Sequence, residues 1–174
     1  MKNQGLTQVY TGDGKGKTTA ALGLALRALG WNKKVCMIQF IKGDKKIGEI
    51  KISKNYLPHF SIHQFSKDTR FILKANKSDQ LVAQKTLKHA EKVINSKKFD
   101  IVILDEINIA MSLKLITINS VLEIIKSKPK KLELILTGRN APQKIIDAAN
   151  LVTEMKMIKH PYYKNIPARK GIDF

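Results

Sequence analysis

Two kinds of hydrophobic pattern alternate along this 174-residue chain. Short and nearly continuous apolar runs, such as KVCMIQFI over residues 34–41, are typical of strands that are covered on both faces of a sheet. Longer stretches carry apolar residues three or four positions apart, as Ala83, Leu87 and Ala90 do, and these predict amphipathic helices. The predicted strands cover residues 6–10, 34–41, 60–65, 99–104, 132–136 and 151–157, and the predicted helices cover residues 19–29, 79–95, 118–126 and 142–150.

Strands and helices therefore alternate over most of the chain. This order is typical of an α/β domain in three layers, with helices on both faces of a mainly parallel sheet. Residues 45–58 are polar and poorly periodic, and they predict a loop or a short irregular helix. The sequence shows no internal repeat and no linker, so we expect a single domain over residues 1–174.

The stretch TGDGKGKT at residues 11–18 lies between the first predicted strand and the first predicted helix. Strand, glycine-rich loop, Gly-Lys-Thr and helix form the context of a phosphate-binding loop, in which backbone N–H groups and the helix N-terminus bind an anion. Lys17 is expected to lie on the phosphates, and the Thr18 hydroxyl to reach a Mg²⁺ ion that bridges them. We therefore expect a P-loop NTPase-like (RecA-like) domain whose nucleotide-binding residues include Gly12, Asp13, Gly14, Lys15, Gly16, Lys17, Thr18 and Thr19.

Thr11 stands where the general motif G-x-x-x-x-G-K-[ST] has its first glycine. Gly12 and Gly14 supply backbone freedom next to it, so the loop is still expected to close. A lysine- and glycine-rich surface turn is the alternative interpretation of the same residues. The strand before the loop and the helix after it favour nucleotide binding.

Charged residues follow two other predicted strands, at the edge of the sheet where ligands bind in such folds. Asp105 and Glu106 end the fourth predicted strand and are expected to bind the Mg²⁺ (or Mn²⁺) ion, directly or through water. An acidic pair that stabilises a helix N-terminus is the alternative. Arg139 follows the fifth predicted strand and is expected to bind phosphate. Arg27, late in the first helix, is a further candidate for phosphate binding or a structural residue near the helix C-terminus.

The chain carries 32 lysines and arginines against 14 aspartates and glutamates, a formal net charge of +18. Such an excess attracts polyanions and would suit a nucleic-acid-binding protein. Only four of the basic residues are arginines, however, and the lysines are scattered and not interleaved with aromatic residues. A solvated lysine-rich surface is the better interpretation, with nucleotides rather than nucleic acid as the expected partner.

The sequence begins MKNQGLTQ, without an apolar signal segment, and no run approaches the roughly 18 apolar residues of a membrane span. We therefore expect a cytoplasmic protein with no membrane partner. The single cysteine, Cys36, excludes an intramolecular disulfide and is expected to be a buried apolar residue. The four histidines show no metal-ligand spacing.

Residues 76–79 read NKSD, which matches the guanine-binding N-K-x-D motif of GTP-binding switches. In those proteins the motif comes after the metal-binding D-x-x-G, whereas here it precedes the acidic strand, and no D-x-x-G follows the loop at a suitable distance. A capped helix start, with Ser78 as the N-cap, is therefore the better interpretation. A GTP-binding switch and a P-loop ATPase that acts on nucleic acid remain the two alternatives to be tested.

Taken together, these motifs resemble those of the P-loop ATP:corrinoid adenosyltransferases, the family that adenosylates cob(I)yrinic acid a,c-diamide and cob(I)alamin. The resemblance covers nearly the whole chain, and its most specific part is the C-terminal end. The matching segments are YTGDGKGKTT (10–19), QFIKG (39–43), LDE (104–106), LTGR (136–139), VTEM (152–155), IKHPY (158–162) and KGIDF (170–174).

The resemblance implies that a corrinoid reduced to Co(I) attacks the 5′ carbon of ATP and releases triphosphate, in corrinoid biosynthesis or salvage. Lys17, Thr18 and Glu106 would then be the catalytic residues, with Asp105 as a further metal ligand. The nucleotide is implied to lie in the loop in the reverse of its usual direction. A homodimer and an electron-donating reductase, a flavoprotein, are implied as well.

The chain departs from the family pattern at two places. Asp13 replaces the asparagine often found between the first two loop glycines. Many members also carry a glycine and Phe-x-Trp after the third strand, and those aromatic residues help to remove the lower ligand of the corrinoid. The corresponding residues 68–71 read DTRF, so the corrinoid-binding residues expected from the resemblance are Phe71 and His160.

Overall fold

The computed structural model describes residues 4–41, 43–66 and 76–174 of the chain. Within these residues, six strands form one sheet in the order β3-β2-β4-β5-β1-β6, and every neighbouring pair is parallel. The strands are β1 (Thr7–Thr11), β2 (Val35–Gln39), β3 (Phe60–Gln64), β4 (Ile101–Asp105), β5 (Glu133–Thr137) and β6 (Leu151–Glu154). The α/β class with a parallel sheet, expected from the sequence, is confirmed.

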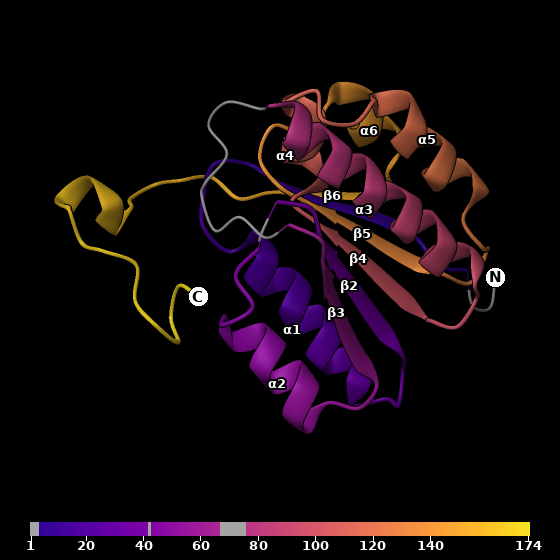
Figure 1. Cartoon of the computed structure of the whole chain (residues 1–174), viewed down its shortest axis with the longest axis horizontal. Helices are drawn as coiled ribbons and strands as arrows, with labels where there is room; N and C mark the ends of the chain where they lie inside the picture. Colours follow the sequence, from indigo (N-terminus) through magenta and orange to yellow (C-terminus); the bar gives the residue numbers. More distant parts are fainter. Residues whose placement is uncertain (1–3, 42, 67–75) are drawn as a thin grey trace.

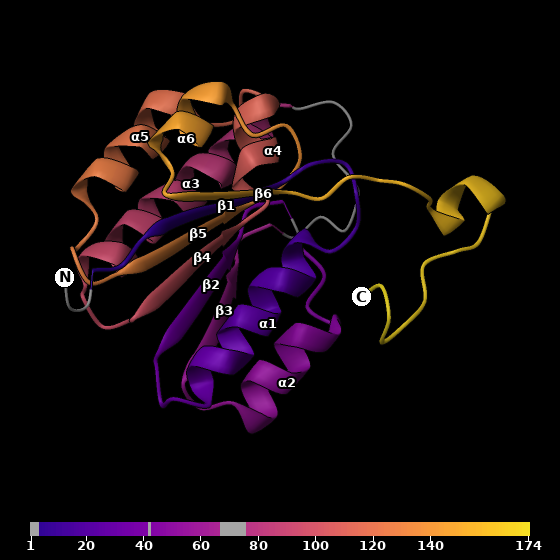
Figure 2. The same cartoon turned by 180° about the vertical axis from the view of Figure 1, so that it is seen from behind.

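Helices cover both faces of this sheet and give the three expected layers (Figures 1 and 2). One face carries α1 (Lys17–Leu29) and α2 (Gly48–Tyr56). The other face carries α3 (Lys77–Asn95), α4 (Ile107–Ser112), α5 (Ile118–Ser127) and α6 (Gln143–Ala148). A short 3₁₀ helix, η1 (Pro161–Lys164), lies beyond β6 and outside the layers.

The central strands β2 and β4 are buried at every position, which explains their continuous apolar sequences. On one face of the sheet, Leu104 belongs to the same hydrophobic cluster as Ala90 of α3. On the other face, Met37 clusters with the small residues Ala21 and Ala25 of α1, which let the helix approach the strands closely. Each fully buried leucine, isoleucine or methionine contributes roughly 1.5–3 kcal/mol. The sheet is therefore a firm support for the loops at its ends.

The parallel pairing brings the carboxyl ends of several strands to one edge of the sheet. Tyr10 pairs with Thr137, and Gln39 pairs with Asp105. Strand β5 lies between β1 and β4 in the sheet. Thr137, the last residue of β5, therefore stands between the glycine-rich loop that follows β1 and the acidic pair that ends β4.

Two helices differ from the sequence-based expectation. Residues 45–58 contain the regular helix α2, in which only Ser53 is buried; its hydroxyl donates to the Phe60 carbonyl at 2.6 Å. Because the buried position of α2 is a serine, the sequence of this helix shows no buried apolar residues at helical spacing. Helix α4 was not predicted at all. It has six residues, and both Ile107 at its start and Met111 near its end are buried. It therefore lacks the exposed polar face that produces a helical pattern in the sequence.

Helix α3 begins with a capping box made by Asn76 and Asp79. The Asp79 N–H donates to Asn76 Oδ1 at 2.9 Å, and the Asn76 N–H donates to Asp79 Oδ2 at 3.0 Å. The capped helix start inferred for the NKSD sequence is confirmed. The capping residue is Asn76, not Ser78, because the helix begins two residues earlier than expected, at Lys77.

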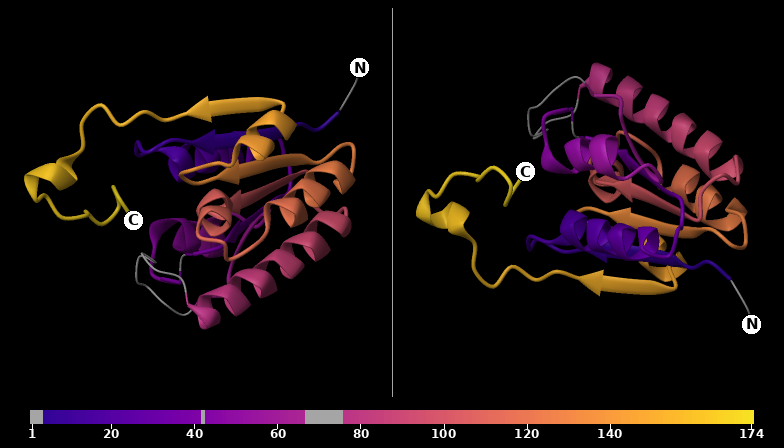
Figure 3. Two further views of the ribbon diagram at one scale, coloured as in Figure 1. Left: turned by 90° about the horizontal axis from the view of Figure 1, so that it is seen from above. Right: turned by 90° about the horizontal axis from the view of Figure 1, so that it is seen from below.

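After β6 the chain leaves the layered domain as an extended segment, residues 155–174, which we call the C-terminal arm. It carries η1 away from the sheet, and its end turns back toward the helices α1 and α2 (Figures 1 and 3). Most residues of the arm are exposed. In the part of the chain that the structure describes, no helix combines the length and the apolar character needed to cross a bilayer.

Candidate active site

The glycine-rich loop between β1 and α1 takes its shape from two glycines with positive φ. The φ angles of Gly12 and Gly16 are 91° and 122°, a region that residues with a side chain rarely adopt. A Cβ atom on Gly12 would lie 2.5 Å from the Met155 carbonyl oxygen, so the loop packs directly on the chain that follows β6. Thr11, in the place of the first motif glycine, ends β1, and its hydroxyl accepts a hydrogen bond from the Ala141 N–H at 3.2 Å. The turn is therefore made one residue later, at Gly12.

Lys17 begins α1 and is buried, with its ammonium group directed back into the loop. Nζ donates to the carbonyl oxygens of Gly12 at 2.6 Å and Gly14 at 2.7 Å. Burial lowers the pKa of Lys17, the carboxylate of Glu106 raises it, and the charge of Arg139 lowers it. Two cations therefore lie near the loop and near each other. Such a group can stabilise several phosphate charges at once.

Asp105 is completely buried at the end of β4 and accepts hydrogen bonds from three other elements. Thr18 Oγ1 donates to Oδ1 at 2.9 Å, and Thr137 Oγ1 donates to the same oxygen at 2.7 Å. Gln39 Nε2 donates to Oδ2 at 3.2 Å. A buried carboxylate requires such donors because an isolated charge is strongly destabilising in the interior. The network joins the start of α1 to β2, β4 and β5 at one point.

Glu106 follows Asp105 in a left-handed backbone conformation, with a φ of 62°. This conformation is uncommon for a residue with a side chain and is often found at functional sites. The Glu106 N–H donates to Thr137 Oγ1 at 3.0 Å. A Cβ atom on Gly138 would lie 3.1 Å from Glu106 Oε2 and 3.2 Å from Asn108 Cβ. The end of β5 therefore determines how much room the Glu106 carboxylate has.

The oxygen atoms of Thr18, Asp105 and Glu106 are the kind of ligand that a hard divalent cation prefers. Across residues 4–41, 43–66 and 76–174, no group of three or more histidine, cysteine, aspartate or glutamate side chains could hold a metal ion by itself. A divalent ion at these oxygens would therefore need phosphate and water oxygens to complete its coordination, as Mg²⁺ does in many nucleotide sites. The donor set fits Mg²⁺.

A pocket of about 700 Å³ opens beside the loop. Leu22, Leu26 and Ile52, from α1 and α2, form an apolar part of its wall. His160 also lines the pocket, and its Nδ1 accepts a hydrogen bond from the backbone N–H of Tyr162 at 3.1 Å. A mixed wall of this kind suits a ligand that combines phosphates with ring systems. Its polar end is lined by Gly14, Lys15, Gly16, Lys17, Thr18, Thr19, Glu106 and Arg139.

Five of the sequence-predicted site residues are not among those that line this pocket, and one of them, Asp105, is completely buried at the end of β4. Gly12 and Asp13 belong to the loop but not to the pocket wall. Arg27 is exposed in the last turn of α1, about 15 Å along the helix from its first residue. Burial and the charge of Glu133 raise the pKa of Tyr10, and the charge of Arg27 lowers it, so Arg27 lies near Tyr10 of β1. Phe71 lies outside the described residues.

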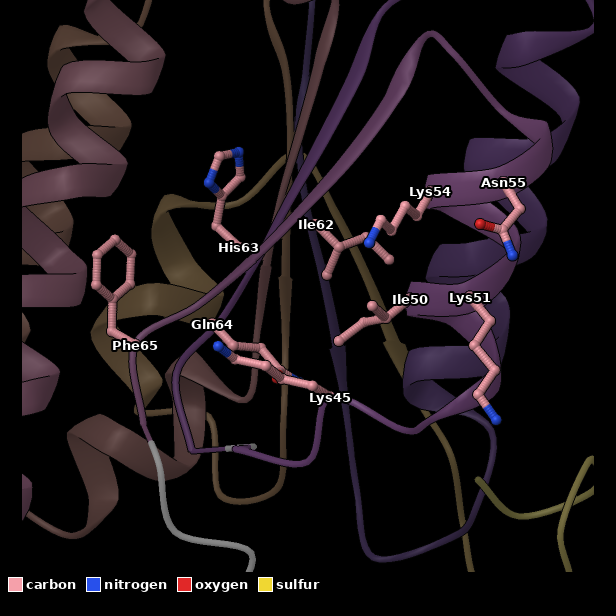
Figure 4. Close-up of a pocket in the computed structure, with 9 residues that line it drawn as sticks. All are labelled: Lys45, Ile50, Lys51, Lys54, Asn55, Ile62, His63, Gln64 and Phe65. Atoms are coloured by element: carbon pink, nitrogen blue, oxygen red, sulfur yellow. The ribbon is translucent and has the colours of Figure 1, made fainter.

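A second cavity, of about 660 Å³, lies between the edge strand β3 and helix α2 (Figure 4). Ile50 and Ile62 point into it, and Lys45, Lys51 and Lys54 lie around it. None of the residues that the sequence predicts for nucleotide, metal or corrinoid binding lines this cavity. The candidate chemistry therefore belongs to the pocket beside the glycine-rich loop.

Sequence reasoning missed three residues of the site. In the turn at residues 137–140 it predicts a role for Arg139 alone, although Thr137 and Gly138 shape the positions of both carboxylates. Gln39, which binds Asp105, was not predicted either. The available signal was a polar residue that ends an otherwise apolar strand, because such residues reach the carboxyl edge of the sheet.

The fold and the loop together define a P-loop nucleotide-binding α/β domain. A KaiC-like protein from Pyrococcus horikoshii has a similar fold, with a TM-score of 0.58 and 15% identity, over 90% of this chain and 75% of that chain. A structure of ATPases 2 and 3 of EccC from Thermomonospora curvata gives a TM-score of 0.52 and 13% identity, over 97% of this chain and 35% of that chain. At such low identity, these likenesses show the fold alone.

Sequence comparison identifies the family within this class. The model of the family "ATP:corrinoid adenosyltransferase BtuR/CobO/CobP" matches residues 3–174. Corrinoid adenosyltransferases of Sinorhizobium and Pseudomonas aeruginosa are 35% and 33% identical, over 98% of this chain and over 81% and 84% of their own lengths. That of Salmonella typhimurium is 30% identical over 100% of this chain and 88% of its own length. The chain belongs to the ATP:corrinoid adenosyltransferase family.

The resemblance inferred from the motifs is thus confirmed, and the protein is a transferase that adenosylates corrinoids with ATP. The comparisons favour neither the nucleic-acid-dependent ATPase nor the GTP-binding switch. For the switch, the structure supplies a reason: Asp79 of the NKSD sequence is engaged in the capping box of α3 and does not line the pocket beside the loop.

Proposed function

We propose that the pocket beside the loop binds ATP and a reduced corrinoid together, so that Co(I) can attack the 5′ carbon of ATP. The cobalt electron pair forms the Co–C bond, the bond between C5′ and its oxygen breaks, and triphosphate leaves with that bonding pair. The observation that carries this proposal is a pocket whose polar end holds Lys17, Thr18, Glu106 and Arg139 and whose remaining wall is partly apolar. No protein base is required, since the nucleophile is the metal of the substrate.

The leaving triphosphate is a polyanion, and its stabilisation is the main task that falls to this chain. Lys15, Lys17 and Arg139 line the pocket, and the loop amides and the start of α1 add further positive potential. Lys17 would exchange its two carbonyl partners in the loop for phosphate oxygens. Burial lowers its pKa, while the charge of Glu106 opposes this shift and favours the protonated form that the role requires.

Mg²⁺ is proposed as the cofactor, held by Thr18 and Glu106 with Asp105 behind them. When bound, the ion would neutralise part of the phosphate charge. Asp105 accepts the hydrogen bond of the Thr18 hydroxyl and so fixes the position of the Thr18 oxygen beside the loop. Displacement at carbon needs in-line positioning, and the buried bonds around Asp105 supply a support of the necessary rigidity.

The corrinoid is proposed to lie over the apolar part of the pocket, with His160 and Phe71 as contacts. His160 lines the pocket, which supports this role.

We further propose a homodimer, a flavoprotein reductase as electron donor, and a cytoplasmic location. Size-exclusion chromatography with light scattering tests the dimer, and reduction of the corrinoid by added flavoproteins tests the electron donor.

The proposed chemistry can be tested anaerobically. The protein is mixed with chemically reduced cobalamin, Mg²⁺ and ATP, and the light-sensitive Co–C product and the triphosphate are measured together. Equal amounts of both are expected. The Lys17→Ala variant should lose at least about 100-fold in rate, because it lacks a cation at the developing charge.

Lys126→Ala is the matched control for that variant. Lys126 is exposed on α5 and pairs only with Glu123 at 3.2 Å among the described residues, so its removal should leave the rate unchanged. Formation of ADP and phosphate instead of triphosphate, or a rate that does not depend on the corrinoid, would contradict the proposal. Stimulation by a polynucleotide would point to the nucleic-acid-dependent ATPase.

A further inference from the structure

The C-terminal arm is attached to the glycine-rich loop where it leaves β6. The Met155 N–H donates to the Thr11 carbonyl at 2.8 Å, and the Gly14 N–H donates to the Met155 carbonyl at 2.7 Å. A Cβ atom on Gly14 would lie 2.6 Å from that same Met155 oxygen. The loop and the first residue of the arm are therefore packed backbone against backbone.

The arm returns to the same loop at its other end. Lys15 Nζ donates to the Ile172 carbonyl at 3.2 Å and forms an ion pair with Oδ1 of Asp173. The second oxygen of Asp173 accepts hydrogen bonds from the backbone N–H and from Nε of Arg169, at 2.8 Å and 3.1 Å. Both oxygens of this carboxylate are thus engaged. The arm is closed on the loop at both ends.

Asp173 is unlike an ordinary surface carboxylate. Its side chain is 20% exposed, and it is bound by two different cations and a backbone N–H. An exposed ion pair contributes little because water and salt screen it and two long side chains must be ordered. A carboxylate that accepts several charge-assisted bonds in one compact turn is held more firmly. The bond to Lys15 is the point at which this turn is attached to the loop.

The attached turn forms part of the wall of the active-site pocket. Residues 171–174 line the pocket together with Lys15. Ile172 and Phe174 expose 62% and 46% of their surface, although both are large apolar residues. Apolar surface left open beside a phosphate site suits a ligand whose phosphates bind the loop and whose ring packs on the wall.

Lys15 can serve the arm and a phosphate at the same time. An ammonium group carries three donors, and the arm uses two of them, on Ile172 and Asp173. The ion pair fixes where the ammonium lies before a nucleotide arrives. Fixing it in advance removes an entropic cost from binding, which raises the affinity for the nucleotide.

We propose that Asp173 is a positioning residue of the enzyme: by pairing with Lys15 it docks the C-terminal turn on the glycine-rich loop and so completes the binding site for ATP. This rests on the proposed function, in that ATP is taken as the nucleotide of this pocket. Asp173 acts through Lys15 and the turn, and it takes no part in the displacement itself. Loss of its charge is therefore expected to weaken ATP binding and to leave the chemical step largely intact.

The docking can be measured without any substrate by limited trypsin digestion of the full-length protein. The cleavage sites of the arm are exposed side chains, but docking at both ends restricts the backbone movement that a protease requires. Release of the arm should remove this restriction, so the Asp173→Asn variant should be cut in the arm about tenfold faster than the unaltered protein. Asp173→Glu should restore much of the protection, because it keeps the charge. The trypsin sites of the arm are Lys156, Lys159, Lys164, Arg169 and Lys170.

Glu123→Gln is the matched control, since it removes one carboxylate from an exposed lysine pair, on α5. It should change neither the digestion nor the kinetics. A charge-swapped protein, Lys15→Asp with Asp173→Lys, tests the pair directly: each single change should speed digestion of the arm, and the double change should slow it again. This readout does not depend on whether the swapped protein is active.

Calorimetry with ATP and Mg²⁺ and steady-state kinetics with reduced cobalamin measure the consequence. Asp173→Asn should weaken ATP binding and raise the KM for ATP about five- to tenfold, while kcat at saturating ATP stays within about twofold. Unchanged digestion would overturn the docking, and faster digestion with unchanged ATP affinity would reduce Asp173 to a structural residue. A tighter affinity would show that Asp173 competes with phosphate for Lys15, which also overturns the proposal.

The proposed reaction and the proposed positioning role of Asp173 can be contradicted independently of each other. The digestion and the calorimetry contain no corrinoid, so they report on Asp173 even if no adenosylated product is formed. Absence of the Co–C product together with weaker ATP binding in Asp173→Asn would contradict the proposed reaction alone. Product formation with normal ATP binding in Asp173→Asn would contradict the positioning role alone.

Discussion

Thr18 and Asp105 are joined by a hydrogen bond of 2.9 Å from the threonine hydroxyl to the carboxylate. The two residues lie 87 positions apart in the sequence. Thr18 lies in the first turn of α1, which follows β1, and β1 is separated in the sheet by β5 from β4, which ends at Asp105. Thr137, at the end of β5, donates to the same carboxylate oxygen at 2.7 Å. The acidic side of the proposed nucleotide site is thus built by three chain segments that only the parallel sheet brings together.

Replacement of Thr137 by valine tests this network. Valine has nearly the same shape, but it removes both the donor to Asp105 and the acceptor for the Glu106 N–H. We expect a loss of about 1–3 kcal/mol in the free energy of unfolding, because buried polar groups lose their partner. We also expect kcat/KM for ATP to fall roughly tenfold or more as the two carboxylates shift. Chemical denaturation and steady-state kinetics measure the two effects.

Thr137→Ser is the control for that experiment. It keeps the hydroxyl and removes only a methyl group, so most of the activity should remain. Equal activity in the valine and serine variants would show that the hydroxyl of Thr137 does not hold the site.

Gly138→Ala should disturb the site through the backbone. Gly138 has a φ of 125°, and an added Cβ would lie 3.1 Å from Glu106 Oε2 and from the Ile109 backbone nitrogen. We expect a loss of about 1–3 kcal/mol in the free energy of unfolding and a large loss of activity.

Gly23→Ala should have the opposite effect on stability. This glycine lies inside α1 with open space around it, so alanine should stabilise the fold by about 0.5–1 kcal/mol. Thermal unfolding measures both effects. A shift of the midpoint temperature in the same direction for the two variants would contradict this prediction.

The stability of the fold should decrease in mildly acidic solution. His63 of β3 and His89 of α3 lie with their ring centroids 4.8 Å apart. The His63 ring lies on the side of β3 opposite to Ile62 (Figure 4). Burial lowers the pKa of both histidines. The charge of His89 lowers the pKa of His63 further, and the charge of Lys92 lowers the pKa of His89 further. Their folded-state pKa values therefore lie below the unfolded value of about 6.5.

The sign follows from proton uptake. Above about pH 7.5, a unit above the unfolded pKa of about 6.5, both histidines are neutral in both states, and the full stability is present. As the pH falls below that value, the unfolded chain binds protons that the folded chain resists, so the free energy of unfolding falls. Replacement of both histidines by glutamine should flatten this dependence between about pH 7.5 and pH 5.5, as measured by urea unfolding. The same slope in the doubly substituted protein and in the unaltered protein would contradict this prediction.

Asp79→Ala distinguishes a helix cap from a guanine-binding residue. In the capping box, Asp79 accepts from the Asn76 N–H at 3.0 Å. Its removal should lower the stability by about 1 kcal/mol and should leave the preference between ATP and GTP unchanged. A loss of nucleotide binding on this substitution would instead revive the GTP-binding switch. Competition between the two nucleotides in a calorimeter provides the measurement.

Much of this site could be predicted because its local signals are strong. Glycines and Lys17 at fixed spacing after a strand indicated the phosphate loop, and the acidic residues after a continuous apolar run indicated the opposite side of the site. Helix α4 carried no such signal, and for Gln39 and Thr137 the signal was a polar residue after an apolar run, which does not indicate what that residue binds. Such partners depend on which strands are neighbours in the sheet, and hydrophobic periodicity does not contain that information.

The C-terminal end illustrates the same division. Its segments IKHPY and KGIDF were the most family-specific part of the chain, yet nothing in them indicated a partner for Asp173. The sequence by itself determined the alternation of strands and helices, the loop and the family, because these depend on local pattern and on motif spacing. Only the tertiary structure decided that Thr18, Asp105 and Thr137 meet and that Asp173 reaches Lys15, since contacts over such separations arise from strand order and from the path of the chain after β6.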